Sequence, residues 1–340
     1  MNLKQEFEFL KYCFSRRKDS RFIKNVMSLS GDHSLVHMQK MGGTKDTGIL
    51  YYIKMEPSYS GFFADHNRLL TLLYYADYYG MKPVVEYGEE YTYREEHPVN
   101  GTNNPFEYYF EQPCGIGPGQ LKEYKGVICS RKENVALAGI KHSGRGGSYG
   151  IPEEYLDALA KVSKRFIRLN STVGSMIEKS VLEIKQGKRT LGVHVRGTDF
   201  KRNYNGHPIC IEVAEYLEEA KRVFSQKQYE RVFLATDDVQ AVGLFQAEFG
   251  DKLAYYDDVY RSDGNETVMK SEATRENHHY LLGLEVLRDM MTLAECDGLV
   301  AGLSQVSYSA RIQKKSQGKE YDDLVILFKG INEHGENCVH

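Results

Sequence analysis

Four short stretches, LGVHV (191–195), RVFLAT (231–236), DGLVAGL (297–303) and DLVILF (323–328), decide the fold predicted for the second half of this 340-residue chain. They are almost entirely apolar, which is typical of strands that are buried on both faces. Helical periodicity fills the intervals between them, at about 212–226, 239–249, 279–294 and 305–315. Alternating strands and helices build βαβ units, so this half is predicted to be a doubly wound parallel sheet of the α/β class.

The first half carries a smaller α/β pattern. Runs of β-branched and aromatic residues at 49–55 and 82–88 predict two strands, and the helix between them is expected to be capped by Asp65 and to end at Gly80. The segment 89–150 is rich in turn residues and predicts irregular structure carried on the same domain.

A helix start at Ile151-Pro152-Glu153-Glu154 opens a long apolar periodicity that ends near Gly187, as one helix or two. We expect this segment to connect two domains. The predicted division is an N-terminal domain, 1–187, that includes the connecting helix, and a C-terminal domain, 188–340.

Composition excludes several classes of protein. The chain has 44 Lys and Arg against 47 Asp and Glu, so its net charge of −3 argues against non-specific nucleic-acid binding. Its six cysteines are scattered without a CxxC pair, which indicates reduced thiols and no zinc site. No stretch approaches 18 apolar residues and the first residues lack a signal-peptide core. We therefore expect no membrane span and a cytoplasmic location, either free or peripheral at the inner membrane face.

Polar residues follow three of the predicted strands, where ligands bind in doubly wound sheets. His194 and Arg196 are two positions apart in a strand, so they share a face, and a guanidinium suits phosphate oxygens. Gly197 then lets the backbone approach a ligand closely. The alternative is an inter-domain salt bridge beside a core histidine.

The other two strand ends are also open to two readings. Ser304 and Gln305 begin a helix whose free N–H groups form an anion site, or Ser304 is only an N-cap. Asp237 and Asp238 either hold a divalent cation or cap the next helix. The chain has neither a GxGxxG after a strand nor a GxxxxGK[ST], which argues against a dinucleotide oxidoreductase and a P-loop kinase.

The stretches GVHVRGTDF, Gly206-His207-Pro208, FLATDD and AECDGLVAGLSQVSYSARI, in this order, resemble the fucosyltransferase superfamily, and in particular α1,6-fucosyltransferases of nodulation-factor and N-glycan-core type. The resemblance spans roughly Leu191 to Ile312. It implies a GT-B-like fold of two α/β domains facing a cleft. It also implies inverting transfer from a nucleotide sugar, usually GDP-fucose, without a metal or other cofactor.

The resemblance also implies roles for single residues. Arg196 would hold the β-phosphate, His194 and Asp297 would face the guanine, and Ser304 and Gln305 would touch the diphosphate. Asp237 and Asp238 match paired acids near the donor. Gly197 stands where the family often has a second arginine. A carboxylate proposed as the base in this family has no clear counterpart in the loop after Arg196. Asp199 is the nearest carboxylate and is our candidate for the base, and its alternative role is to orient Arg196.

In the first half, GFFADHNRLL resembles the family's glycine-rich loop, and His66 and Asn67 are candidate substrate-binding residues there. A general base can come from either domain, so Asp65 and His66 are first-domain candidates for this role. The alternative interpretation of Asp65 is a helix N-cap, and that of His66 is a histidine at the surface. The tyrosine-rich segment between Tyr51 and Tyr109 suits an oligosaccharide acceptor, or simply packs the sheet.

The predicted function is fucosyl transfer from GDP-fucose to a glycan hydroxyl, in bacterial surface-polysaccharide or oligosaccharide assembly. The expected partners are thus a nucleotide-sugar donor and a glycan acceptor. One alternative is a metal-dependent transferase that uses another nucleotide sugar through Asp237 and Asp238. The other is a nucleotide- or glycan-binding module with weak or no catalysis. The sequence predicts neither the acceptor nor the oligomeric state.

Overall fold

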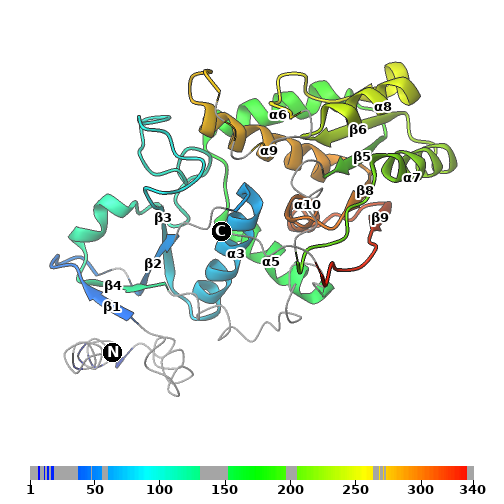
Figure 1. The fold of residues 1–340 in the computed structure, drawn as a ribbon. Coiled ribbons are helices and arrows are strands. Elements are labelled where there is room, and N and C mark those ends of the chain that lie inside the picture. The colour runs from blue at the N-terminus through cyan, green and yellow to red at the C-terminus, as the bar shows by residue number, and fades with distance from the viewer. Residues whose placement is uncertain are drawn as a thin grey trace.

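The computed structural model describes residues 37–46, 48–55, 60–130, 152–196, 205–262 and 273–334, with a few single positions besides. Across these ranges the chain forms two sheets with helices between them (Figure 1). The helices that lie between the sheets pack on one another and are α3 (Phe62–Tyr78), α5 (Glu153–Phe166) and α10 (Gln305–Ser316). The prediction of two α/β parts is confirmed.

The C-terminal sheet has the topology predicted from the four apolar stretches. Its described strands are β5 (Thr190–Val195), β6 (Arg231–Thr236), β7 (Leu253–Ala254), β8 (Gly298–Gly302) and β9 (Asp323–Leu327). Their order is β7-β6-β5-β8-β9, and every neighbouring pair is parallel. The strand order therefore reverses between β5 and β8, which is the point where doubly wound sheets bind ligands. The two-residue strand β7 was not predicted.

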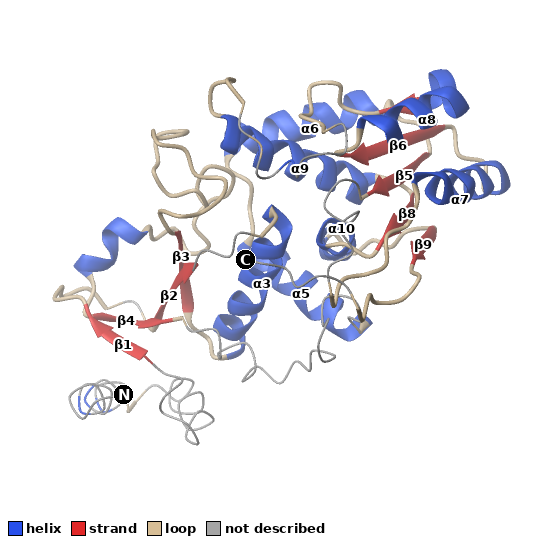
Figure 2. Cartoon of the chain, viewed as in Figure 1, coloured by secondary structure: helices blue, strands red, loops and turns tan. Residues whose placement is uncertain are grey.

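Helices cover both faces of this sheet (Figure 2). One face carries α7 (Val213–Gln226) and α8 (Val239–Phe249), and the other carries α6 (Ser171–Lys185) and α9 (His278–Glu295). Along β6, Val232 and Leu234 join the core under α7 and α8, whereas Phe233 and Ala235 join the core under α9. Burial on both sides explains why the strands show no polar alternation.

The N-terminal sheet is mixed. It consists of β1 (His37–Lys40), β4 (Gly126–Cys129), β2 (Leu50–Met55) and β3 (Lys82–Tyr87) in that spatial order. β2 runs parallel to both neighbours, and β1 pairs antiparallel with β4. The strands expected at 49–55 and 82–88 and the helix between them are confirmed. β1 was not predicted, and both β4 and the 3-10 helix η2 (Pro118–Glu123) fall in the segment expected to be irregular.

Side-chain amides cover the edge of β3. Gln112 Oε1 accepts from the N–H of Val85 at 3.0 Å and Asn104 Oδ1 accepts from the N–H of Tyr87 at 3.0 Å. Both side chains also donate to the carbonyl of Val85. The turn-rich segment after β3 thus satisfies the strand edge without adding a strand.

The start of α3 differs from the prediction. Its N-cap is Gly61, so the assignment of Asp65 as the cap is wrong. Asp65 lies one turn inside the helix, where it is buried and forms an ion pair with Arg68 at 3.6 Å.

The connecting segment forms two helices, α5 and α6. Asn170 lies between them and begins α6. Its Oδ1 accepts from the N–H of Val173 at 3.0 Å and so caps this helix. α6 packs against α9 and β6 of the C-terminal sheet. A division of the chain between residues 187 and 188 stays a prediction.

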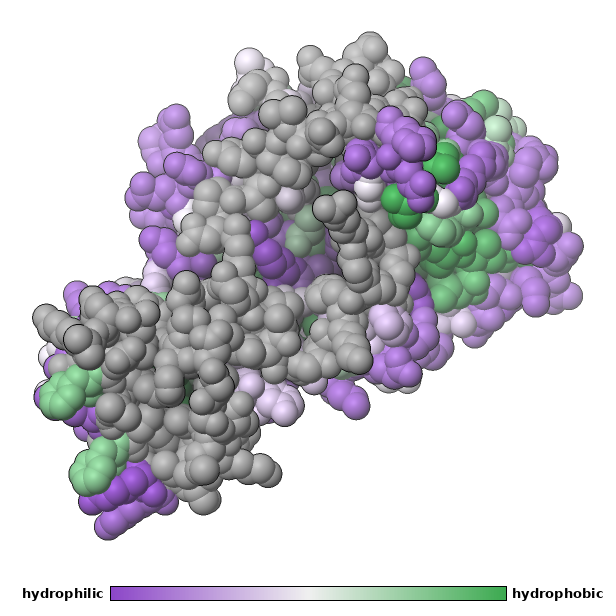
Figure 3. Space-filling model, turned by 60° about the horizontal axis from the view of Figure 1, so that its bottom comes forward, coloured by the Kyte–Doolittle hydropathy of each residue, from purple (hydrophilic) through white to green (hydrophobic). Residues whose placement is uncertain are grey.

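Among the coloured residues in Figure 3, most at the surface are hydrophilic, and an apolar patch lies on the C-terminal half. In this half the large hydrophobic side chains of Ile209, Leu324 and Phe328 are exposed. Of the helices in the described ranges, none is both long and apolar enough to cross a bilayer.

Candidate active site

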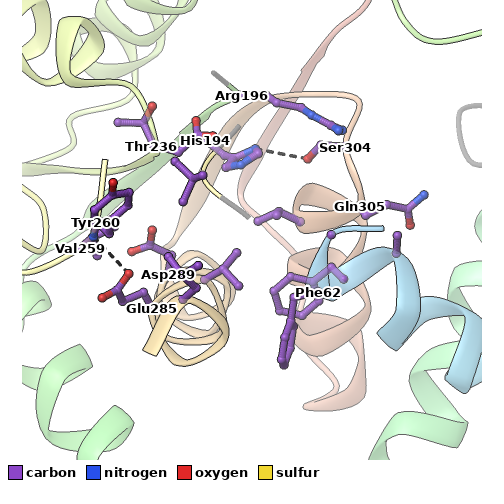
Figure 4. Close-up of a pocket in the computed structure, with 18 of the residues that line it drawn as sticks. Phe62, His194, Arg196, Thr236, Val259, Tyr260, Glu285, Asp289, Ser304 and Gln305 are labelled. Carbon is purple, nitrogen blue, oxygen red and sulfur yellow. Dashed lines mark hydrogen bonds between the residues drawn. The ribbon is translucent and has the colours of Figure 1, made fainter. Parts of the chain in front are cut away.

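A pocket lies where the carboxyl ends of β5, β6 and β8 meet the N-terminal half, beside the reversal point of the sheet (Figure 4). It brings together side chains from both halves of the chain. The residues that line it are Gly61, Phe62, Phe63, Ala64, Tyr93, His194, Arg196, Thr236, Asp237, Val259, Tyr260, Val268, Leu282, Glu285, Val286, Asp289, Ser304, Gln305 and Val306.

The end of β5 supplies His194 and Arg196. Both line the pocket, whereas Val193 and Val195 join the core on the opposite face, so the expectation that the two side chains share a face is confirmed. Nδ1 of the buried His194 lies 3.3 Å from Oγ of Ser304. The backbone of Arg196 is hydrogen-bonded to Tyr216. This contact fixes the backbone from which the Arg196 side chain extends.

The loop between β8 and α10 begins the helix at the pocket. Ser304 Oγ accepts from the N–H of Ser307 at 3.0 Å, and Ser307 Oγ accepts from the N–H of Ser304 at 3.1 Å. Ser304 is therefore an N-cap, while Gln305 and Val306 place the first turn of the helix at the pocket. First-turn N–H groups have no acceptor within a helix, so this end attracts anions. Ser304 can therefore be the N-cap of α10 while the start of the same helix forms an anion site.

The opposite side of the pocket carries two carboxylates on successive turns of α9, Glu285 and Asp289. Glu285 is occupied, because it accepts from both terminal nitrogens of Arg275 and from the N–H of Tyr260 at 3.1 Å. Asp289 is buried, and its Oδ1 has no hydrogen-bond partner among the described residues. Burial raises the pKa of Asp289 to about 7, although nearby Arg288 acts in the opposite direction.

The paired acids after β6 have separate surroundings. Asp237 lines the pocket. Asp238 is fully buried and its Oδ1 accepts from the N–H of Gln240 at 2.8 Å, as the N-cap of α8. The expectation that one of the pair is a helix cap is confirmed, and Asp238 is not a pocket residue. Across the described residues, no group of three or more His, Cys, Asp and Glu side chains is arranged to hold a metal ion.

The assignment of Asp297 to the guanine site is corrected. Asp297 precedes β8, and its carboxylate accepts from the N–H of Thr190 at 2.8 Å and pairs with Lys185 at 3.4 Å. Thr190 is the first residue of β5. Since all strands here are parallel, Asp297 lies at the amino edge of the sheet, the end away from Arg196 and Ser304.

The candidates from the first half are also corrected. His66 is buried between the rings of Phe63 and Phe110, and burial lowers its pKa to about 4. It is neither the expected surface histidine nor a pocket residue. Asn67 donates to Oε1 of Gln305 at 2.8 Å and so joins α3 to α10. Gly197 and Asp199 lie outside the described residues.

Several pocket residues were missed by sequence reasoning. Phe62 and Tyr93 form one wall, where the N–H of Phe62 donates to the Tyr93 hydroxyl at 2.9 Å. Glu285 and Asp289 form another. The only available signal was their spacing of four on the predicted helix 279–294, which places two carboxylates on one helix face.

Comparisons with known proteins give low sequence identities. No family model and no curated protein matches the chain. Among solved structures, the chain is similar to the NodZ fucosyltransferase from Bradyrhizobium, with 16% identity and a TM-score of 0.44, over 78% of this chain and 93% of that one. It is also similar to POFUT1 in complex with GDP, with 10% identity and a TM-score of 0.48, over 83% of this chain and 99% of that one. A function for this chain therefore rests on its own side chains.

Proposed function

We propose that the chain is a glycosyltransferase that transfers fucose from GDP-fucose to a hydroxyl of a glycan. The observation that carries this proposal is the arrangement of charged groups at two opposite ends of the pocket. Arg196 and the start of α10 form an anion-binding end, and the buried Asp289 forms a carboxylate end on the other side (Figure 4). A nucleoside diphosphate has the matching polarity, with phosphates at one end and a base at the other.

The carboxylate end selects guanine. Guanine presents two neighbouring donors, N1–H and the 2-amino group, and a carboxylate accepts from both. Adenine presents an acceptor at N1 instead. The unpartnered Oδ1 of Asp289 gives such a base a buried acceptor, and an unsatisfied buried carboxylate is costly when the pocket is empty.

The anion-binding end supports the chemical step. An acceptor hydroxyl attacks the anomeric carbon while the bond from that carbon to the β-phosphate oxygen breaks, and the acceptor proton passes to a base. Negative charge grows on the leaving diphosphate, where positioned donors lower the barrier. Arg196 and the first-turn amides of α10 supply these donors. Asp199 stays our candidate for the base, with orientation of Arg196 as its alternative role.

The identity of the sugar rests on the resemblance of the stretches around Arg196, Asp237 and Ser304 to fucosyltransferases. Inversion at the anomeric carbon, a role in bacterial surface-polysaccharide assembly and a cytoplasmic location stay predictions.

The direct test is release of GDP from GDP-fucose when the purified chain meets a mixture of oligosaccharide acceptors. UDP-galactose and CMP-sialic acid serve as donor controls. We expect GDP release that depends on acceptor and is lost in Arg196→Ala. Equal turnover of UDP-galactose, or no turnover of any donor, would contradict the proposal.

Asp237 favours a second candidate, a metal-dependent transferase, because it places a carboxylate in the pocket. Asp238 caps α8, so in this candidate Asp237 is the acid of the pair that would bind the cation. Loss of transfer in EDTA with recovery on Mn²⁺ would support this candidate, and transfer unchanged by EDTA would exclude it. Tight GDP binding without transfer to any acceptor would instead indicate a binding module.

A further inference from the structure

A second hollow lies at the carboxyl ends of β2 and β3 in the N-terminal sheet. We call it the polar groove. It has a volume of about 630 Å³, and its charged lining residues are Lys54, Glu86, Glu89, Glu90, Arg94 and Glu107. Pockets for small ligands commonly have about 300–1,000 Å³. The place of this groove matches the general position of ligand sites in parallel α/β sheets.

The polar groove continues into a neighbouring hollow of about 430 Å³ that shares Thr102 and Glu107 with it. Hydrogen bonds hold the side chain of Glu107, which lines both hollows. Glu107 accepts from the Thr102 hydroxyl at 2.7 Å through one oxygen and from the side-chain amide of Gln112 at 2.7 Å through the other. The far end reaches Asn170, which caps α6. The combined surface is elongated and lined by amides, hydroxyls and carboxylates, the groups that bind sugar hydroxyls.

The groove adjoins the donor pocket along the chain. Tyr93 lines the donor pocket and the next residue, Arg94, lines the polar groove. The Tyr93 hydroxyl accepts from the N–H of Phe62, which ties this segment to the start of α3. Consecutive residues of one segment therefore line the donor pocket and the polar groove.

Charge restricts what the groove accepts. Its lining has four carboxylates against two cations. Glu86 accepts from the Tyr52 hydroxyl, and Glu107 is occupied by the contacts described above. Glu89 and Glu90 are exposed at the rim. The field at the groove repels anionic sugars, accepts neutral ones and attracts sugars that carry an amine.

We propose that the polar groove binds the acceptor glycan, and that this acceptor is a neutral or amine-bearing oligosaccharide long enough to occupy both hollows. This inference rests on the proposed transferase function, because it assigns the groove to the second substrate of the same reaction.

The experiment measures binding of three tetrasaccharides of different charge by calorimetry at low salt. They are cellotetraose, the β1,4-linked tetramer of glucosamine, and tetragalacturonic acid. The rim variant Glu89→Lys/Glu90→Lys is compared with wild type and with the control Glu178→Lys/Glu183→Lys, whose exposed side chains lie on α6. GDP affinity and thermal unfolding are measured for every protein, so that a folding defect or a failed donor site is recognised separately.

We expect wild type to bind the glucosamine tetramer and cellotetraose more tightly than tetragalacturonic acid. The rim variant should bind the glucosamine tetramer about three- to tenfold more weakly, with unchanged GDP affinity and unchanged cellotetraose affinity, while the control should match wild type. Tightest binding of tetragalacturonic acid, or identical affinities in the rim variant, would overturn the inference. GDP binding without binding of any tetrasaccharide would overturn it and leave the donor site standing. Failure to bind GDP would overturn the proposed function itself.

Discussion

The side-chain amide of Asn67 donates to Oε1 of Gln305 at 2.8 Å, which joins α3 of the N-terminal half to the first residue of α10. Asn67 Nδ2 also lies 3.3 Å from the carbonyl of Gln305, and its Oδ1 accepts from Ser309 at 2.9 Å. The helix start that attracts anions is thus held by the same contacts that hold the two halves together. We therefore expect packing of the halves and affinity for the proposed donor to be coupled at Asn67.

The first prediction concerns this coupling. Asn67→Ala removes two short side-chain hydrogen bonds, to Gln305 Oε1 and from Ser309. Each contributes about 0.5–1.5 kcal/mol, so the free energy of unfolding should fall by about 1–3 kcal/mol. GDP affinity should fall as well, because Gln305 loses its anchor. A double-mutant cycle with Gln305→Ala, read by chemical unfolding, should give a coupling energy above about 0.5 kcal/mol. Strictly additive effects would show that the contact does not couple the halves.

The second prediction concerns Arg196. Arg196→Ala should weaken GDP binding by about 1.5–3 kcal/mol, which is roughly 10- to 150-fold, through loss of a charge-assisted hydrogen bond. The loss in kcat should be larger, because the diphosphate gains charge in the transition state. Arg196→Lys should restore little, since lysine lacks the planar fork.

Calorimetry with GDP and steady-state kinetics with GDP-fucose check these effects. The matched control is Arg222→Ala, an exposed arginine on α7 that pairs with Glu219. Normal GDP binding and normal transfer in Arg196→Ala would remove the basis of the site.

The third prediction concerns pH. Burial raises the pKa of Asp289 to about 7, so its carboxylate form becomes dominant as the pH rises through this value. GDP affinity should therefore increase between about pH 6 and pH 8, because guanine donors require the carboxylate. In Asp289→Asn, GDP affinity should be weak and should lose this dependence. The opposite slope, or an unchanged slope in the variant, would contradict the assignment.

Asp289 also makes folding stability depend on pH, and this dependence has the opposite sign to that of GDP affinity. In the ligand-free protein the raised pKa means that the folded state binds more protons than the unfolded state between about pH 4 and pH 7. The contribution of Asp289 to stability is thus lost as the pH rises through this window. Asp289→Asn should be more stable than wild type at pH 8, and the difference in chemical unfolding should shrink toward pH 4.

The fourth prediction separates Asp297 from the donor site. Asp297→Ala leaves the N–H of the buried Thr190 without its side-chain acceptor, which should cost about 1–3 kcal/mol of unfolding free energy. GDP affinity should remain that of wild type, because Asp297 lies at the amino edge of the sheet. Chemical unfolding and calorimetry measure both quantities. Weakened GDP binding in a fully folded Asp297→Ala protein would place this carboxylate at the guanine after all.

Much of the C-terminal fold was predictable because buried parallel strands are marked by short apolar runs. The period of two along β5 also placed His194 and Arg196 on one face. The strands β1 and β4 were missed, since four-residue strands carry too short a pattern to separate from loops.

Two misassignments in the site, Asp297 and His66, and one omission, Asp289, have physical causes. Asp297 was assigned through the resemblance, although a residue that precedes a parallel strand lies at the edge away from the ligand. Asp289 was missed because its role depends on burial, which appears only when α9 packs over the sheet. His66 was expected at the surface, yet neighbouring aromatic rings enclose it.

The most direct test of the central claim, that the pocket binds a guanosine diphosphate, is thermal unfolding with GDP, UDP, CMP and ADP at equal concentrations. At about 100 times its dissociation constant, a ligand adds about 2.7 kcal/mol of stability. For a chain of this size we predict that GDP raises the Tm by several degrees and that UDP, CMP and ADP leave it nearly unchanged. Equal protection by UDP, or no shift with GDP, would contradict the account.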